Sequence, residues 1–284
     1  MSNLFFVTLC IIDEMTKKEL HITMDKLKIG IIGFGNMGQA MAKGWIRSDK
    51  IKPENILASA RNVKRLEQNC SKIGTRAYEN IKELVADADV IVLAVKPYQI
   101  KSLVDPIKQL LKEKIIISVA AGINNLDYQD IVLEGTQHVS TIPNTPVSIG
   151  EGVIIVEKTH TLTKDNTVMI ENLLSLLGIV EFIETEQLSI AGTLAGCGPA
   201  FASMFIEALA DGAVKYGLSR DEAYRLASQM MAGTGKLQLQ TGEHPAAMKD
   251  AVTSPGGTTI KGITKLEQKG FRGAVISAID AIEG

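Results

Sequence analysis

The chain has 284 residues, of which 45% are hydrophobic and 22% charged, and its formal net charge is -2. This composition is typical of a soluble globular protein of about two domains, and it excludes a disordered or fibrous chain. The near balance of charges offers no concentrated basic surface, so we expect no nucleic-acid partner.

An apolar run, "LFFVTLCII" (4–12), stands near the start of the chain. It is too short to cross a bilayer, and it has neither a basic stretch before it nor a small-residue cleavage site after it. We therefore expect no membrane span and no signal peptide. We interpret residues 1–24 as an N-terminal extension, with Met24 as the functional start. A short strand or helix packed on the protein body is the alternative.

Residues 25–183 alternate short apolar runs with amphipathic segments such as "MGQAMAKGWIRS" and "NVKRLEQNC", which have helical spacing. Consecutive apolar positions rich in Val and Ile are typical of parallel strands buried on both faces. The alternation predicts an N-terminal Rossmann domain, an α/β fold with a doubly wound, mostly parallel sheet. The expected strands lie in "KIGIIG", "NILASA", "DVIVLAV", "KIIISVAAG", "HVSTIP", "GVIIVE" and "IVEFIE".

Residues 184–284 lack strand patterns and predict an all-α C-terminal domain. The segment "PAFASMFIEALADGAVKYG" (199–217) is apolar around nearly its whole circumference and ends on Gly217, a residue type common just after helices. A helix this apolar must be buried, either in its own domain or against another chain. In a domain of about 100 residues, this favours a core shared by two copies, a homodimer.

The first strand is followed directly by "GFGNMG", in which Gly33, Gly35 and Gly38 form a G-x-G-x-x-G pattern at the start of a helix. Such glycines allow a tight turn and let a pyrophosphate approach the backbone N–H groups of the helix start. The pattern alone is weak, but its place in the first βα turn makes it a strong indication of a dinucleotide site.

The second strand ends in "ASARNVK", where an NAD enzyme usually has an acidic residue for the ribose hydroxyls. Here Ser59 and Arg61 stand instead, and a hydroxyl with a guanidinium suits a 2′-phosphate. We therefore favour NADPH as the cofactor, with NADH as the less preferred one. The alternative is that Arg61 belongs to a solvated helix start.

Three further strand ends should lie at the same edge of the sheet, in "LAVKP" (93–97), "VAAGI" (119–123) and "PNTP" (143–146). We interpret Lys96 as a residue that packs its stem or attracts phosphate, rather than as a catalytic base. By residue type alone, Asn144 is equally suited to a structural turn and to the wall of a site.

The segment "SPGGTT" (254–259) precedes the expected helix "TIKGITKLEQ". Its glycines allow consecutive N–H groups to converge on an anion, and the positive end of the helix adds to the attraction. On residue type alone, an ordinary N-capped helix start is the favoured interpretation.

Cysteines and histidines are scattered along the chain without the close spacing of a metal site, so we expect no metal. Widely spaced cysteines also favour a reducing compartment, the cytoplasm. We interpret Cys197 as a small residue at a close helix contact rather than as a reactive thiol.

The chain resembles the pyrroline-5-carboxylate reductase family, from Lys28 to its end. The matching motifs follow in that family's order: "IGFGNMG", "LAVKP", "PNTP", "GCGPAF", "EALADGAVKYGL" and "AVTSPGGTTIKGITKLE". The resemblance implies reduction of 1-pyrroline-5-carboxylate to L-proline, the last step of proline biosynthesis, by hydride transfer from NAD(P)H. It also implies a homodimer formed through the helical domain, which can assemble into larger rings.

The resemblance implies site residues position by position. The cofactor should contact Gly33, Phe34, Gly35, Asn36, Met37, Gly38, Ser59, Arg61, Asn80, Ala94, Val95, Lys96, Pro97, Ala120, Ala121 and Gly122. The substrate should contact Ser254, Gly256, Gly257, Thr258 and Thr259, with the Thr259 hydroxyl facing the ring nitrogen as the catalytic group. Alternative functions are a related imine or β-hydroxyacid dehydrogenase, and a catalytically silent NADP-binding regulator of the same fold.

Overall fold

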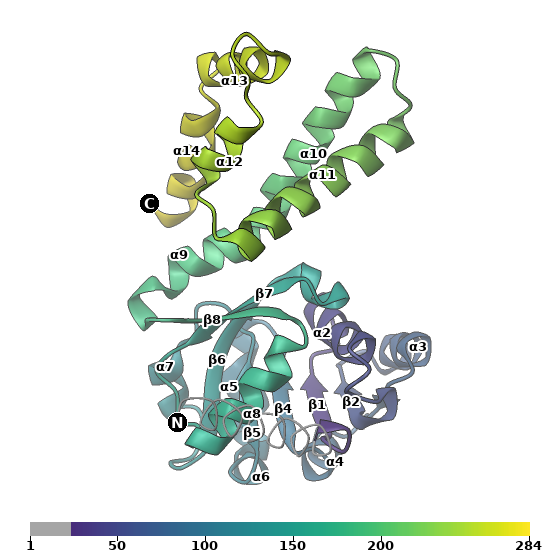
Figure 1. Cartoon of the computed structure of the whole chain (residues 1–284). Helices are drawn as coiled ribbons and strands as arrows, with labels where there is room; N and C mark the ends of the chain where they lie inside the picture. The colour runs from purple at the N-terminus through teal and green to yellow at the C-terminus, as the bar shows by residue number, and fades with distance from the viewer. Residues whose placement is uncertain (1–23) are drawn as a thin grey trace, which may run out of the picture. The chain divides into compact units, whose positions relative to one another are not determined.

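The computed structural model describes residues 24–284, so the proposed extension lies outside the described residues except for Met24. The chain divides into two compact units between Gly196 and Cys197, and each is described here by itself (Figure 1).

The first unit is built on one eight-stranded sheet with the strand order β3-β2-β1-β4-β5-β6-β7-β8. Neighbouring strands are parallel except for the antiparallel pair β6 and β7. This confirms the predicted doubly wound, mostly parallel sheet. The strands are β1 (Ile29–Ile32), β2 (Ile56–Ser59), β3 (Arg76–Ala77), β4 (Val90–Leu93), β5 (Ile115–Ser118), β6 (Gln137–Pro143), β7 (Gly152–Glu157) and β8 (Gly178–Ile183).

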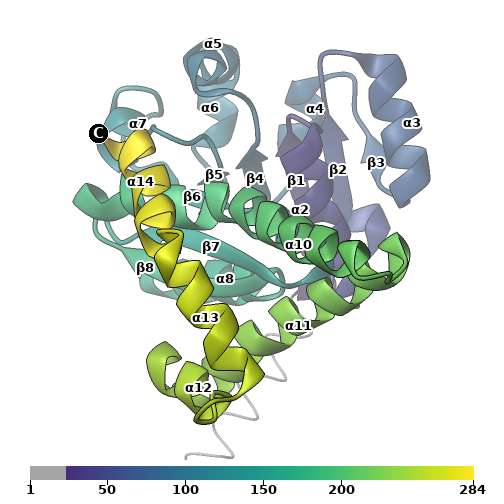
Figure 2. The same cartoon turned by 90° about the horizontal axis from the view of Figure 1, so that it is seen from above.

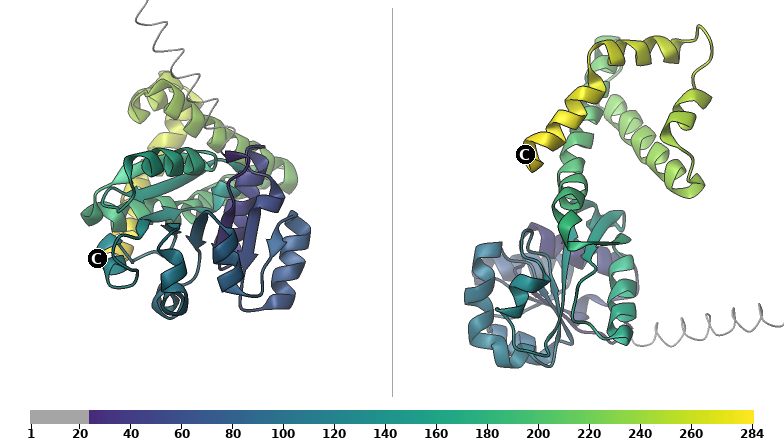
Figure 3. Two further views of the ribbon diagram at one scale, coloured as in Figure 1. Left: turned by 90° about the horizontal axis from the view of Figure 1, so that it is seen from below. Right: turned by 90° about the vertical axis from the view of Figure 1, so that its left-hand side faces the viewer.

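Helices cover both faces of this sheet (Figures 2 and 3). One face packs against α2 (Asn36–Arg47), α3 (Val63–Ile73) and α8 (Lys164–Ser175). The other face packs against α4 (Ile81–Asp87), α5 (Ile100–Val104), α6 (Lys108–Leu111) and α7 (Asn125–Gln129). Short 3₁₀ turns connect them: η1 (Pro53–Asn55), η2 (Pro97–Gln99), η3 (Asp105–Ile107), η4 (Thr145–Ile149) and η5 (Thr185–Gln187). Because both faces are covered, the central strands are apolar at consecutive positions, as the sequence patterns indicated.

Helix α2 is deeply packed in the first unit. Trp45 is 0% exposed, and its indole N–H donates to the backbone carbonyl of Leu173 at 2.9 Å, which fastens α2 to α8. On the same helix, Gly44 lies so close to η4 that a β-carbon there would come within 2.1 Å of the Val147 carbonyl oxygen. The rigid "PNTP" loop is therefore packed directly on α2.

The second unit is entirely helical, as predicted. Helices α10 (Gly198–Lys215) and α11 (Arg220–Thr241) form an antiparallel pair, followed by α12 (Pro245–Ala251), α13 (Thr258–Gln268) and α14 (Phe271–Glu283). After α10 the chain turns at Gly217, whose φ is 96°, which confirms the expected helix end. Within residues 197–284, the buried side chains are only those of Ala210, Ala223 and Ala227. The apolar helix expected to be buried is therefore largely exposed in the single chain.

The compact units divide later than the predicted boundary at 183/184. That boundary marks the end of β8, the last strand. The next segment, with α9 (Leu188–Gly192) and the π-helical turn η6 (Thr193–Cys197), contacts the sheet unit. The Thr185 hydroxyl donates to Glu157 at 2.7 Å, and the Asn144 side chain donates to the Ala195 carbonyl at 3.0 Å.

Replacing Gly44 with alanine tests the close packing of α2 on η4. Because the new methyl group would overlap the Val147 carbonyl, we expect Gly44→Ala to destabilise the first unit by about 1–3 kcal/mol. Urea unfolding followed by Trp45 fluorescence measures this. Lys43→Ala, at the neighbouring exposed position of the same helix, is the matched control and should be nearly neutral. Equal stability of the two variants would contradict the packing.

Candidate active site

The carboxyl ends of β1 and β4 form the point at which the strand order reverses. The chain moves from β1 to β2 and β3 on one side, and from β4 to β5 and β6 on the other. Open α/β sheets bind ligands in the crevice at such a point. Here Gly33 leaves β1 with a φ of 104°, and a β-carbon on it would lie 2.3 Å from the Ala94 carbonyl oxygen. The structure thus brings the glycine turn and the "LAVKP" segment together.

The start of α2 fits a dinucleotide pyrophosphate. Gly35 is the N-cap residue, no side chain caps the helix, and its first turn contains no acidic residue. A β-carbon on Gly35 would meet nothing within 4 Å, so the space above this backbone is open. Gly38 is the opposite case, since a β-carbon there would come within 2.5 Å of the Gly33 carbonyl. One glycine therefore leaves room for a ligand, while the other lets α2 pack closely on the turn.

The end of β2 separates the two residues predicted to contact a 2′-phosphate. Ser59 is 2% exposed, and its carbonyl accepts from the Gly33 N–H at 2.8 Å. Its backbone therefore helps to hold the glycine turn after β1 in place. Arg61 is exposed just before α3. The Asn62 side chain caps that helix by accepting from the Arg65 N–H at 3.0 Å. Of these two residues, only Arg61 thus exposes its side chain.

The remaining predicted cofactor residues lie at the same edge of the sheet. Ala94 continues from β4, with its N–H donated to the Ile32 carbonyl at 2.8 Å, and exposed Lys96 precedes η2. After β5, Ala120 is buried while Ala121 and Gly122 are exposed. Asn80 lies beyond β3 and caps α4 by accepting from the Lys82 N–H at 2.9 Å. Two of the predicted side chains are less accessible, since Phe34 is buried in the core and Met37 packs against it.

In the second unit, the segment 254–259 forms a glycine turn that leads into α13. Gly256 has a φ of 71°, and Gly257 is the N-cap residue, with no side chain capping the helix. A β-carbon on Gly257 would come within 2.4 Å of the Ser254 hydroxyl, whereas Gly256 is open. Ser254, Thr258 and Thr259 are exposed. The arrangement presents backbone N–H groups and hydroxyls on one short segment, which suits an anion.

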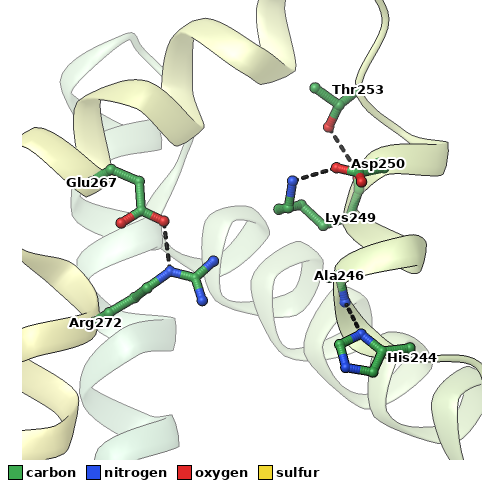
Figure 4. Close-up of polar contacts among 7 residues, drawn as sticks. All are labelled: His244, Ala246, Lys249, Asp250, Thr253, Glu267 and Arg272. Carbon is green, nitrogen blue, oxygen red and sulfur yellow. Dashed lines mark hydrogen bonds and ion pairs between the residues drawn. The ribbon is translucent and has the colours of Figure 1, made fainter.

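Polar contacts hold the elements on both sides of this segment (Figure 4). Before it, the Thr253 hydroxyl donates to the Lys249 carbonyl at 2.6 Å and closes the end of α12. After it, the Arg272 side chain at the start of α14 donates to Glu267 near the end of α13, at 2.6 Å. The first contact therefore fixes the chain just before the glycine turn, and the second joins α13 to α14.

The structure shows which of the two roles considered for Asn144, a structural turn or the wall of a site, its side chain has. Its side chain is 7% exposed and uses both polar atoms inside the chain, donating to the Ala195 carbonyl at 3.0 Å and accepting from the Val153 N–H at 2.9 Å. Asn144 is therefore a structural clamp of the "PNTP" loop.

Within residues 24–284, no group of three or more His, Cys, Asp or Glu side chains could hold a metal ion.

Sequence patterns missed a buried polar network behind the loop that follows β5. The Ser118 and Tyr128 hydroxyls lie 2.6 Å apart, and the Tyr128 ring stacks on His138 with a centroid distance of 3.8 Å. The buried Glu157 carboxylate accepts from the Asn125 N–H at 2.7 Å. Its members come from β5, α7, β6 and β7 and share no motif, so no spacing rule points to them.

A cavity of about 270 Å³ lies beside this network, lined by Tyr128, Thr136 and His138 among others. The His138 Nε2 and the Thr136 hydroxyl are buried without a protein partner, and water in this cavity can satisfy them. Burial, and secondarily the neighbouring His160, lower the pKa of His138 to about 3. Burial also raises the pKa of Tyr128 to about 12. Both side chains are therefore uncharged at neutral pH.

Two family models match the chain. Residues 185–283 match "Pyrroline-5-carboxylate reductase dimerisation", and residues 28–122 match "NADP oxidoreductase coenzyme F420-dependent". The pyrroline-5-carboxylate reductase of Treponema pallidum is 42% identical over 259 residues, which cover 90% of this chain and 98% of that protein. The Escherichia coli pyrroline-5-carboxylate reductase is 37% identical over 253 residues, or 89% and 94% of the two chains.

Solved structures agree with these matches. The chain is similar to Plasmodium falciparum pyrroline carboxylate reductase with NADP bound, with a TM-score of 0.81, 31% identity, and coverage of 91% of this chain and 96% of that one. The Coxiella burnetii pyrroline-5-carboxylate reductase gives a TM-score of 0.80 at 31% identity over 90% and 96%. Aquifex aeolicus prephenate dehydrogenase, at 12% identity and a TM-score of 0.53 over 87% and 98%, shares the fold only.

The buried His138 predicts a loss of stability in mild acid. Its pKa is about 3 in the folded protein and about 6.5 in an unfolded chain, so the unfolded state binds more protons between these values. Stability therefore falls as the pH drops below about 6.5, and at pH 5 the loss amounts to about 2 kcal/mol. Urea unfolding followed by Trp45 fluorescence at pH 7 and pH 5 measures it.

His138→Gln should remove this contribution, so that the variant loses about 2 kcal/mol less than the wild type on acidification. His244→Gln, at the exposed N-cap residue before α12, is the matched control and should show the wild-type pH dependence. An unchanged pH dependence in His138→Gln would contradict the assignment.

Proposed function

The chain belongs to the pyrroline-5-carboxylate reductase family and reduces 1-pyrroline-5-carboxylate to proline with NAD(P)H, and we propose that the two glycine turns described above bind cofactor and substrate. The observation that carries the function is similarity over nearly the full length of both chains, including the segment "SPGGTT".

NADP is the cofactor, and its reduced form, NADPH, would supply the hydride when bound. We propose that its pyrophosphate lies on the N-terminus of α2 above Gly35, where the structure leaves open space and uncapped N–H groups. Arg61 is proposed to bind the 2′-phosphate, because its planar donor fork matches phosphate oxygens and its side chain is exposed at the end of β2. The nicotinamide end is proposed to lie along Ala94–Pro97 and Ala120–Gly122.

The substrate carries a carboxylate, so it needs an anion site apart from the pyrophosphate site. We propose that Ser254–Thr258 supplies it through backbone N–H groups and hydroxyls. The open space at Gly256 and the uncapped start of α13 support this placement. A Lys or Arg side chain is not required, because converging N–H groups and the helix dipole bind the anion.

The imine carbon must face the nicotinamide while its nitrogen becomes an amine. We propose that the Thr259 hydroxyl donates a hydrogen bond to this nitrogen and orients the ring. An alcohol has no pKa near neutrality, so Thr259 assists through its hydrogen bond and does not act as a matched general acid. The ring nitrogen is itself basic, so the protein does not need to supply a strong acid for it. Positioning the two reactants therefore contributes most of the acceleration.

The chain forms a homo-oligomer, as the dimerisation model over residues 185–283 indicates. We propose a homodimer formed through residues 184–284, able to assemble further into rings. By length and composition alone, residues 185–215 could span a membrane: an 18-residue window within them has a mean hydropathy of 1.4, and only 6% of that window is buried. This segment lies inside the dimerisation match, so we propose that a partner chain covers it.

We propose a cytoplasmic location, in keeping with the scattered, unpaired cysteines Cys70 and Cys197.

A steady-state assay of the full chain tests the function. With 1-pyrroline-5-carboxylate, absorbance at the nicotinamide band should fall, and kcat/KM should be higher with NADPH than with NADH. Arg61→Ala should lower kcat/KM for NADPH by about tenfold through loss of a charged hydrogen bond, and should leave the NADH value within about twofold. No turnover with either cofactor would overturn the proposal.

Substitution of Thr259 tests its role toward the imine. We expect Thr259→Ala to lower kcat by about a hundredfold, while the Kd for NADPH stays within about twofold. Thr259→Ser keeps the hydroxyl and should restore most of the activity. Thr264→Ala is the matched control, because Thr264 lies in the same helix and donates to the Ile260 carbonyl. Unchanged turnover in Thr259→Ala would refute the assigned role.

A further inference from the structure

The loop from Val119 to Asn124 has an exposed middle and anchored ends. Ala121 and Gly122 are exposed, and Gly122 has a φ of 80°. These are the residues at which we place the nicotinamide end of the cofactor. A loop without regular structure holds such a position only if other parts of the chain fix its ends.

The first end is fixed through the Ser118 hydroxyl. This oxygen accepts from the Ala120 N–H at 3.3 Å and lies 2.6 Å from the Tyr128 hydroxyl. The Ser118 carbonyl in turn accepts from the Thr141 hydroxyl at 2.9 Å. All these atoms are buried, so the hydrogen bonds are shielded from water and the loss of any one leaves an unsatisfied polar group.

The second end is fixed where α7 begins. Asn124 forms a capping box with Asp127, whose carboxylate accepts from the Asn124 N–H at 2.9 Å. The next N–H, of Asn125, donates to the Glu157 carboxylate at 2.7 Å. Glu157 is 0% exposed, and its second oxygen accepts from the Thr185 hydroxyl at 2.7 Å. A carboxylate is costly to bury, and here its hydrogen bonds hold α7 and η5 to the end of β7.

Tyr128 connects the two ends, because it lies on α7 and contacts Ser118 at the end of β5. Its ring is held in place by stacking on His138. The ring alone would be sufficient for packing, since Tyr128 belongs to the apolar cluster on this face of the sheet. Its hydroxyl, in contrast, is directed at the residue that binds the Ala120 N–H.

We propose that Tyr128, Ser118 and Glu157 are positioning residues that hold the loop 119–124 in the shape that binds the nicotinamide end of the cofactor. None of them touches the reacting atoms. The inference rests on the proposed place of the cofactor at Ala120–Gly122, and it adds that a hydroxyl on α7 acts on binding through Ser118.

Two conservative variants and their combination test the connection. Tyr128→Phe keeps the ring and its stacking and removes only the hydroxyl, while Ser118→Ala removes the acceptor of the Ala120 N–H. Each should raise the Kd for NADPH by about three- to tenfold, measured by fluorescence titration without substrate. Because Tyr128 acts through Ser118, the double variant should bind NADPH about as weakly as Ser118→Ala alone. In turnover, KM for NADPH should rise while kcat changes little.

Two further variants and one further measurement distinguish a positioning role from general destabilisation. Tyr216→Phe removes a hydroxyl from an exposed tyrosine in the second unit and should leave NADPH binding unchanged. Glu157→Gln keeps the size and one acceptor of the side chain but loses the charge, and should raise the Kd for NADPH by a few-fold. Amide hydrogen exchange at Ala120 and Gly122, measured by NMR on the unliganded protein, should accelerate in Tyr128→Phe and Ser118→Ala.

Each result either supports or overturns the inference. Unchanged exchange at Ala120 in both variants would show that the network does not hold the loop. Multiplied effects in the double variant would show that Tyr128 does not act through Ser118. Faster exchange with an unchanged Kd for NADPH would show that the loop is held but does not bind the cofactor, which would overturn the proposed cofactor placement and leave the substrate assignment to Thr259 standing. If Tyr128→Phe does not fold, Ser118→Ala with the exchange measurement decides the question.

Discussion

At Gly33 the chain leaves β1 with a φ of 104°, and a β-carbon there would lie 2.3 Å from the carbonyl oxygen of Ala94. Only glycine allows this approach of two backbones. The contact brings the ends of β1 and β4 together where the strand order reverses, and it aims the chain directly into α2. The open space over Gly35 and the uncapped N-terminus of α2 depend on that turn. Without it, the sheet would still form, but its edge would offer no place for a pyrophosphate.

The two proposed anion sites, one in each unit, share the same physical design. In each, a glycine with positive φ precedes a helix whose first N–H groups have no side-chain cap, at Gly33 before α2 and at Gly256 before α13. The groups presented are backbone N–H and neutral hydroxyls, which do not titrate near neutrality. A reductase whose substrate and cofactor are both anionic therefore needs few charged side chains at its site, and a chain with a net charge of -2 can still hold both.

Local patterns predict the sheet well, because strands buried on both faces must be apolar at consecutive positions. Strand β3 was missed because Arg76–Ala77 is short and exposed and leaves no such run. The glycine spacing correctly predicted a tight turn between β1 and α2, since the steric demand of such a turn is local. The network around Tyr128 has no local signal: Asn125 and Glu157 are 32 residues apart, and a tyrosine on a short helix resembles any core residue. Ser59 is a similar case. Its place at the end of β2 could be predicted from the sequence, but the burial of its side chain could not.

The helical unit presents a different constraint, because it buries few side chains by itself. Large apolar side chains remain exposed along its helices: Met204, Tyr216, Leu226, Leu237, Leu239 and Ile276. Fixing the backbone of so many residues costs conformational entropy that this little burial does not offset. A partner chain that covers these helices is therefore a condition for their stability, as the dimerisation model over 185–283 implies. The proposed substrate segment 254–259 belongs to this unit, whereas the proposed cofactor edge belongs to the unit with its own packed core. On these proposals, assembly would be linked to the substrate site through folding, independently of any contact that a partner makes with the substrate.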